Sequence, residues 1–174
     1  MKLERRRNSR LLVAAIATAA LALAACDRLP LYSRYTAVDS EGWQRTDSIS
    51  FAVPALQPGS YAFRLSVRTT SRYPYTQLSV VVRSSDRAHR HHRTDTLTLD
   101  ITDAAGTFLG SGTALHEYTL PMPPVVLDTI TPLRLTVGHN MSQQALPGIS
   151  DLGLIVERQL ARPSHLAPRL EIKN

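Results

Sequence analysis

Apolar and polar residues alternate along a series of short segments of the chain. In residues 60–68, four apolar side chains alternate with small or basic ones, so that one face of a strand would be buried and the other exposed. Residues 95–102 repeat this pattern, with leucine and isoleucine set against threonine and aspartate. Residues 76–84 are β-branched and denser in apolar side chains, which favours a more central strand. The same reasoning predicts further strands at 31–38, 48–53, 116–120, 132–138 and 152–158.

The segments between these strands carry the signals of turns. Prolines between residues 54 and 147 fall between or at the rims of the predicted strands, where a β protein tolerates them. Residues 103–108 are typical of a turn leading into a short strand, and only residues 139–146 suit one or two helical turns. We therefore expect an all-β fold, a single antiparallel β-sandwich. The jelly roll is one form of it, and closure into a barrel is the alternative.

The first 25 residues differ from the rest. Five basic residues precede the apolar run 11–25, which is shorter than the roughly 20 residues that a membrane-spanning helix needs. A basic start, an apolar run and small residues before a cleavage point are the parts of a secretory signal peptide. The sequence Leu-Ala-Ala before Cys26 resembles the bacterial lipobox, in which the cysteine becomes the first mature residue and carries lipid. The alternative is an ordinary signal peptide followed by a fortuitous cysteine.

This interpretation divides the chain and changes the meaning of its charge. We expect a lipoprotein signal peptide at 1–25, a lipidated tether and lead-in strand at 26–40, and the β-sandwich domain at 41–174. The whole chain has 20 basic and 14 acidic residues, but only 15 and 13 of them follow residue 25. The basic excess therefore belongs mostly to the export signal, and no nucleic-acid partner is predicted. Cys26 is the only cysteine, so hydrophobic burial must hold the fold without a disulfide.

Candidate catalytic and metal-binding residues are few. Three histidines, a residue type that binds Zn²⁺, lie in a loop expected between two strands: His89, His91 and His92. Arginines interleave with them and would repel a cation, which favours a solvated basic loop over a metal site. The nucleophile elbow G-x-S-x-G and a Gly-rich phosphate loop are both missing from the sequence. We therefore expect no enzyme, no catalytic residue and no cofactor.

Several segments, in order, resemble the gliding-motility lipoprotein H (GldH) family of the Bacteroidetes and cover nearly the whole chain after the signal. The matches begin with Cys26 and with Trp43, ahead of the strand expected at 48–53. The further matches are Arg68, Tyr73-Pro74-Tyr75, Leu78, residues 95–103, residues 106–112 with Gly106 and Gly110, Met141, Leu146, Gly148, Ile149, Asp151, Gly153 and Glu157.

Some of the matched residues have a structural interpretation. Gly148 and Gly153 are expected to supply turn geometry. Tyr73 and Pro74 are expected to set the entry into a strand, and Asp151 to cap a tight turn. These residues would then stabilise the fold rather than form a functional site.

The resemblance implies an outer-membrane lipoprotein without catalytic activity, linked to gliding motility and its associated secretion machinery. Acyl chains on Cys26 would anchor it in the membrane. The periplasmic face is favoured because residues 27–35 lack an acidic cluster of the kind associated with surface export. Its partners would be other motility or secretion lipoproteins or membrane proteins. The alternative is a glycan-binding β-sandwich lipoprotein with exposed aromatics such as Trp43 or Tyr75, although Trp43 is expected in the core.

Three tripeptides share the form aspartate, hydroxyl residue, aliphatic residue: Asp47-Ser48-Ile49, Asp95-Thr96-Leu97 and Asp128-Thr129-Ile130. This form resembles the O-glycosylation motif of exported proteins in the same phylum, and it makes Ser48, Thr96 and Thr129 candidate acceptors. The alternative is that such a tripeptide merely begins a strand.

Overall fold

A computed structural model describes residues 29–86 and 92–159. These residues form strands, turns and bends, and no helix among them is long and apolar enough to cross a membrane. The strands are β1 (Tyr32–Ala37), β2 (Trp43–Gln44), β3 (Ile49–Leu56), β4 (Gly59–Thr69), β5 (Gln77–Asp86), β6 (His92–Asp100), β7 (His116–Pro121), β8 (Val125–Leu127), β9 (Thr131–His139), β10 (Ala145–Leu146) and β11 (Ile149–Gln159).

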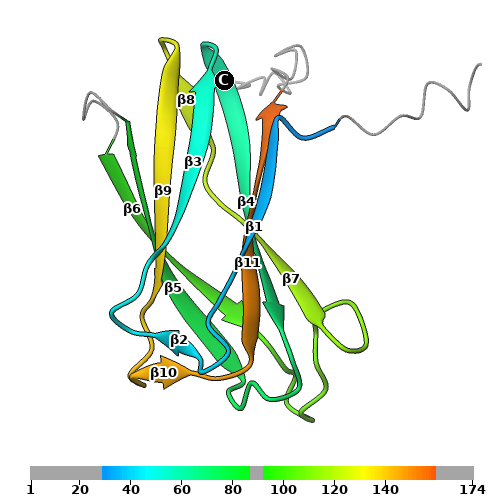
Figure 1. Cartoon of the computed structure of the whole chain (residues 1–174). Helices are drawn as coiled ribbons and strands as arrows, with labels where there is room; N and C mark the ends of the chain where they lie inside the picture. Colours follow the sequence, from blue (N-terminus) through cyan, green and yellow to red (C-terminus); the bar gives the residue numbers. More distant parts are fainter. Residues whose placement is uncertain (1–28, 87–91, 160–174) are drawn as a thin grey trace, which may run out of the picture.

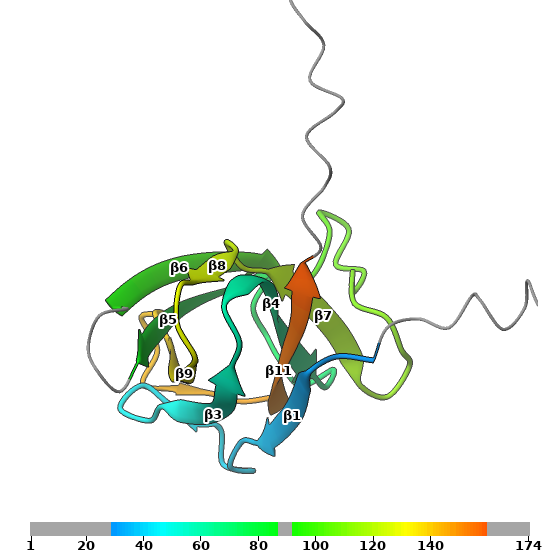
Figure 2. The ribbon, with the colours of Figure 1, turned by 90° about the horizontal axis from the view of Figure 1, so that it is seen from above.

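Two antiparallel sheets form the sandwich (Figures 1 and 2). Sheet A has the order β1-β11-β4-β7, with β8 also paired to β4, and sheet C has the order β3-β9-β5-β6. Apart from β5 and β6, which form a hairpin within sheet C, successive long strands lie in opposite sheets, and these orders are those of a jelly roll. The predicted all-β sandwich is therefore confirmed. Among the described strands, no strand of sheet A pairs with a strand of sheet C, which distinguishes the jelly roll from a closed barrel.

The core lies between the two sheets and follows the alternation of the sequence. On β4, Phe63, Leu65 and Val67 face inward and are almost wholly buried. The central strand β5 contributes Leu78 and Val80 to the same core. Each fully buried side chain of this size contributes roughly 1.5–3 kcal/mol relative to an exposed one. Burial between two facing sheets holds the fold without a disulfide, as the sequence analysis requires.

The structure departs from the sequence-based expectations in the loops. Residues 103–108 form a turn closed by the isolated bridge Thr102–Phe108 rather than a strand. Residues 139–146 contain no helical turn; they lead from β9 into β10, which pairs with β2. The β2–β10 ribbon closes the lower end of the sandwich in Figure 1. The start of β1 and the end of β11 lie toward the opposite end, because the two strands pair antiparallel from Tyr32 opposite Val156.

Candidate functional site

Polar side chains from four strands meet on the outer face of sheet A, near its lower end. The register places Arg68 of β4 between Asp151 of β11 and Glu117 of β7, and places Ser66 and Tyr35 on either side of Gly153. Residues paired across adjacent strands share a face of the sheet, so these side chains are neighbours. We call Tyr35, Ser66, Arg68, Glu117 and Asp151 the outer-face cluster.

Glu117 is the centre of the outer-face cluster. Its Oε1 accepts hydrogen bonds from the Tyr35 and Ser66 hydroxyls, both at 2.8 Å, and its Oε2 accepts one from Arg68 Nε at 3.3 Å. The hydrogen bond from Ser66 is the largest cause that lowers the pKa of Glu117, and Tyr35 and Arg68 add to it against the effect of burial. Glu117 is therefore held as a carboxylate, which only accepts hydrogen bonds.

Arg68 contacts the carboxylates of Glu117 and Asp151 as well as the ring of Tyr35. Its Cζ lies 4.0 Å from the centre of the Tyr35 ring, a cation–π contact, and its Nη1 lies 3.5 Å from Asp151 Oδ1. Burial opposes the charged guanidinium, but the carboxylates of Glu117 and Asp151 outweigh it, so the pKa of Arg68 is raised. The Arg68 and Glu117 side chains are each 33% exposed. The cluster thus presents a cation and an anion in fixed positions to the outside.

Gly153 makes room for this arrangement. A Cβ on Gly153 would lie 2.4 Å from the Tyr35 ring, so only glycine lets the ring lie across β11. Gly153 stands inside β11 rather than in a turn, and the expected turn role is corrected to one of close approach. Asp151 also lies in β11, where it faces Arg68 instead of capping a tight turn.

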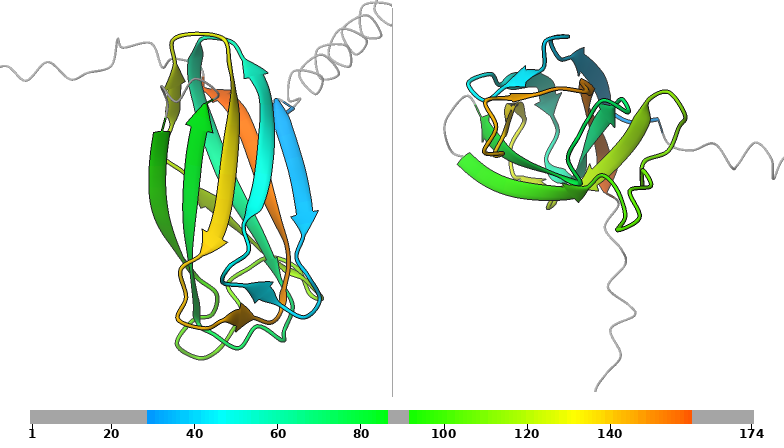
Figure 3. Two further views of the ribbon diagram at one scale, coloured as in Figure 1. Left: turned by 60° about the vertical axis from the view of Figure 1, so that its left-hand side comes forward. Right: turned by 90° about the horizontal axis from the view of Figure 1, so that it is seen from below.

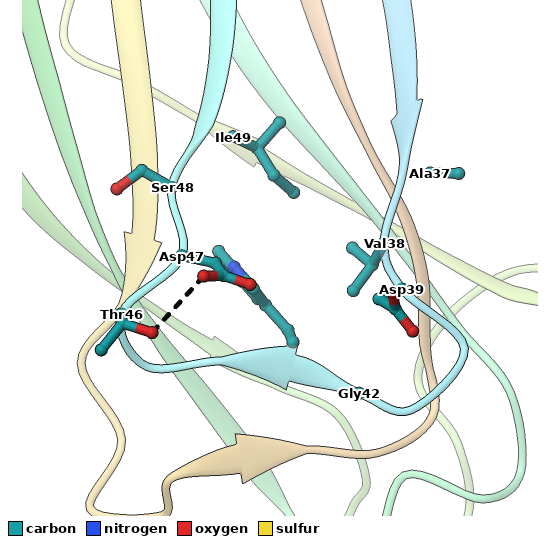
Figure 4. Close-up of a pocket in the computed structure, with 9 residues that line it drawn as sticks. Ala37, Val38, Asp39, Gly42, Thr46, Asp47, Ser48 and Ile49 are labelled. Atoms are coloured by element: carbon teal, nitrogen blue, oxygen red, sulfur yellow. Dashed lines mark hydrogen bonds between the residues drawn. The ribbon is translucent and has the colours of Figure 1, made fainter.

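A cleft of about 540 Å³ opens at the lower end of the sandwich, between the end of β1 and the start of β3 (Figure 4). It is lined by Ala37, Val38, Asp39, Gly42, Trp43, Thr46, Asp47, Ser48 and Ile49. Its rim groups are partly engaged with each other: the Thr46 hydroxyl donates to Asp47 Oδ1, and Asp39 Oδ1 accepts from the Glu41 amide. Ser48, a candidate glycan acceptor, is exposed here.

Trp43 contributes to the lining of this cleft, although its side chain is almost wholly buried. Its side chain is only 2% exposed and meets the His139 ring edge-on, with the ring centres 5.3 Å apart. Burial lowers the pKa of His139. The indole belongs to the core and offers no exposed stacking surface, and Tyr75 is half-buried against Tyr73.

The other matched residues shape turns and close contacts. The Tyr73 hydroxyl donates to the carbonyl of Gln77, the first residue of β5, and Pro74 is exposed beside it. Gly148 has a φ of 81° and lies against the backbone of Tyr73. Gly106 has a φ of 83° in the turn after β6, and a Cβ on Gly110 would lie 2.6 Å from the Tyr118 ring.

The remaining predicted sites are either exposed or outside the described residues. Cys26, His89 and His91 lie outside them, and His92 is exposed on β6. Within residues 29–86 and 92–159, no three His, Cys, Asp or Glu side chains are placed to hold a metal ion. Thr96 is exposed on β6, and Thr129 is exposed in the turn between β8 and β9.

The fold and the outer-face cluster define a jelly-roll sandwich with a charged outer surface. Residues 30–156 match the GldH lipoprotein family. The chain therefore belongs to the GldH lipoprotein family, and the resemblance inferred from the sequence is confirmed. A comparison with curated protein sequences gave no match.

The solved structures to which the chain shows a weak similarity include two carbohydrate-binding modules and a glucuronidase. A CBM35 module in complex with a glucuronic-acid-containing disaccharide is 13% identical, with a TM-score of 0.42 over 72% of this chain and 79% of that one. The carbohydrate-binding module CBM28 is 9% identical, with a TM-score of 0.39 over 72% and 70%. The GH115 4-O-methyl-α-glucuronidase BtGH115A is 10% identical, with a TM-score of 0.44 over 78% of this chain and 18% of that one. Similarity at this level carries no inference about ligands or activity.

Proposed function

We propose that this protein is a non-enzymatic outer-membrane lipoprotein, an accessory component of the gliding-motility and associated protein secretion machinery that acts through protein–protein contacts. Its membership of the GldH lipoprotein family supports the lipid anchor. The lipobox around Cys26 supplies the attachment point, and the periplasmic face of the outer membrane is the proposed location. The observation that carries the contact role is the outer-face cluster.

The anchor would hold one end of the sandwich close to the membrane. The Leu31 amide donates to the Val156 carbonyl at 2.9 Å, so the sheet begins there. Cys26 precedes Leu31 by five residues in the sequence, which reach at most about 17 Å when extended. The end with the start of β1 would therefore face the membrane. The β2–β10 ribbon and the cleft near Trp43 would point away from it.

The outer-face cluster is suited to contact another protein. Its hydrogen bonds and ion pairs fix Arg68 and Glu117, so that little side-chain entropy remains to be lost when a partner binds. Charged groups arranged in this way give specificity and orientation to an interface. Three residues of this region, Arg68, Asp151 and Gly153, are also among those that carry the family resemblance.

Affinity purification of the tagged protein from its native membrane tests the proposal. We expect the lipidated protein to retain membrane proteins of the motility or secretion machinery, and Cys26→Ser to lose them together with the membrane. Arg68→Ala should stay on the membrane but lose the partner. The matched control is Arg83→Ala, because Arg83 is an exposed arginine on the outer face of sheet C.

Two results would contradict different parts of the proposal. If lipidated wild-type protein retains no motility or secretion component, the accessory role is wrong. If Arg68→Ala, shown to be folded by its thermal transition, retains the same partners as Arg83→Ala, the contact lies elsewhere and the cluster is structural.

The glycan-binding alternative lacks its expected aromatic surface among the described residues. It requires an exposed ring such as Trp43, and that indole is 2% exposed. We therefore do not adopt it as a second function.

A further inference from the structure

With nine residues, β6 is the longest edge strand of the two sheets, and no break interrupts its pairing. It lies at the edge of sheet C (Figure 3) and pairs with β5 in unbroken register from Gln77 opposite Asp100 to Ser85 opposite His92, without a proline or a bulge. The opposite edge of sheet C, β3, contains Pro54 and a register shift between Val53 and Leu56. In sheet A, β1 is uninterrupted but has only six residues, β7 ends at Pro121, and β8 has three residues that follow Pro123 and Pro124. Proteins usually blunt exposed edges in these ways because an open edge pairs with another chain.

Hydrogen bonds identify which backbone groups of β6 face outward. The Ser79 carbonyl accepts from the Asn140 amide, so odd-numbered residues of β5 face β9 and even-numbered ones face β6. Val80 pairs with Leu97, which therefore faces β5, and the bond from the Ile101 amide to the Thr76 carbonyl agrees with this assignment. The outward N–H and C=O groups consequently belong to His92, Thr94, Thr96, Thr98 and Asp100. None of these is bonded to another strand within the described residues.

The side chains of the same five residues are complementary to themselves when the strand is reversed. All five are exposed on the outer face of sheet C. A reversed copy centred on Thr96 sets His92 opposite Asp100 and Thr94 opposite Thr98. Cross-strand threonine pairs and pairs of a base with an acid stabilise antiparallel strands. Gln77 donates to only one oxygen of Asp100, Oδ1, so the second oxygen remains for His92.

We propose that two copies of this chain pair through β6, antiparallel about a two-fold axis at Thr96. Each of the outward-facing residue pairs then exchanges two backbone hydrogen bonds, and sheet C continues across both copies. Leu97 and Leu99, which are only half-buried at the inner edge, gain a neighbouring strand. The pairing is a property of β6 and does not depend on the proposed motility role.

This pairing excludes a glycan on Thr96. The two Thr96 residues face each other at the axis, with Cα atoms about 5.5 Å apart in a hydrogen-bonded pair. A sugar on either hydroxyl would separate the strands. A protein glycosylated at Thr96 is therefore a monomer with respect to this edge.

Cysteine cross-linking of the full chain in its native membrane tests the pairing and its register. Thr96→Cys should form a disulfide-linked dimer on mild oxidation, because 5.5 Å lies within the Cα range of a disulfide. Thr94→Cys is the matched control on the same strand and face. In the proposed register its two copies lie about 13 Å apart along the strand, so it should not cross-link alone. Thr94→Cys co-expressed with Thr98→Cys should cross-link, because these two positions lie opposite each other. The wild-type protein serves as the control for any cross-link formed through Cys26.

Each outcome decides the proposal. A Thr96→Cys dimer without a Thr94→Cys dimer supports it, and cross-linking of the co-expressed Thr94→Cys and Thr98→Cys copies fixes the register even if Thr96→Cys does not accumulate. Absence of any cross-link from both arrangements overturns it. Equal cross-linking of Thr94→Cys and Thr96→Cys indicates random collision and also overturns it. A cross-link to a different protein overturns the second copy as the occupant of β6.

Discussion

At the scale of single residues, Gly153 is the position where one added carbon should matter most. The new Cβ of Gly153→Ala would displace the Tyr35 ring and break its hydrogen bond to Glu117. We expect a loss of about 1–3 kcal/mol in the free energy of unfolding, measured by chemical denaturation. Gly138→Ala in β9 is the control, since its Cβ would meet nothing closer than 3.8 Å. Equal losses in both variants would contradict the proposed role of Gly153.

The pH dependence of stability tests the hydrogen bonds to Glu117. The folded-state pKa of this carboxyl is lowered from its ordinary value of 4.5, chiefly by the hydrogen bond from Ser66. A lowered pKa contributes stability above the unfolded value, and this is lost as the pH falls through the folded value. Unfolding free energy measured from pH 7 to pH 3 should therefore fall more in wild type than in Glu117→Gln, with the difference arising below about pH 4.5. Parallel curves for the two proteins would show that Glu117 gains nothing from its partners.

Sequence reasoning found several of these residues but not their relation. The family resemblance singles out Asp151 and Gly153, and the sequence alone suggests a turn for each of them. Their actual roles depend on a register that brings Tyr35 and Glu117 together across 82 positions of the chain. No local pattern encodes such a contact. The one local signal is the alternation in β4, which places Ser66 and Arg68 on the same polar face of the strand.

At the scale of elements, the two faces of β6 should respond differently to proline. The Thr96 amide faces outward, so Thr96→Pro removes no bond to β5, whereas Leu97→Pro removes one to Val80. We expect Leu97→Pro to lower the free energy of unfolding by about 1–3 kcal/mol, because a backbone acceptor on β5 loses its donor, and Thr96→Pro to lower it clearly less, judged from denaturation midpoints. Leu97→Ala corrects for the lost side chain. A larger loss from Thr96→Pro would mean that the edge assignment is inverted.

The long strands were predictable because each repeats its alternation several times. The period-2 pattern at 60–68 lies within β4, and the more apolar segment 76–84 lies within the inner strand β5. The strands β2, β8 and β10 have only two or three residues, too few to show a period. Residues 139–146 lack a helix because Ala145 and Leu146 pair with β2 instead, a tertiary contact that propensity does not include.

At the scale of the whole molecule, the proposed anchor and the sandwich should be separable. All strands of the described residues follow Cys26 in the sequence. Cys26→Ser should therefore move the protein from the membrane fraction to the soluble fraction without changing its thermal transition. Continued association with membranes after a salt wash would show that another part of the chain binds them.

The intact mass of the protein, purified from the outer membrane of its own cells, tests whether the jelly roll is held there through lipid on Cys26. We expect the mass of residues 26–174 plus the glyceride and acyl groups on Cys26, and the loss of these groups in Cys26→Ser. The same spectrum reports any glycan on Ser48, Thr96 or Thr129. A chain that begins elsewhere, or one that begins at Cys26 without lipid, would show that the proposed anchor is wrong.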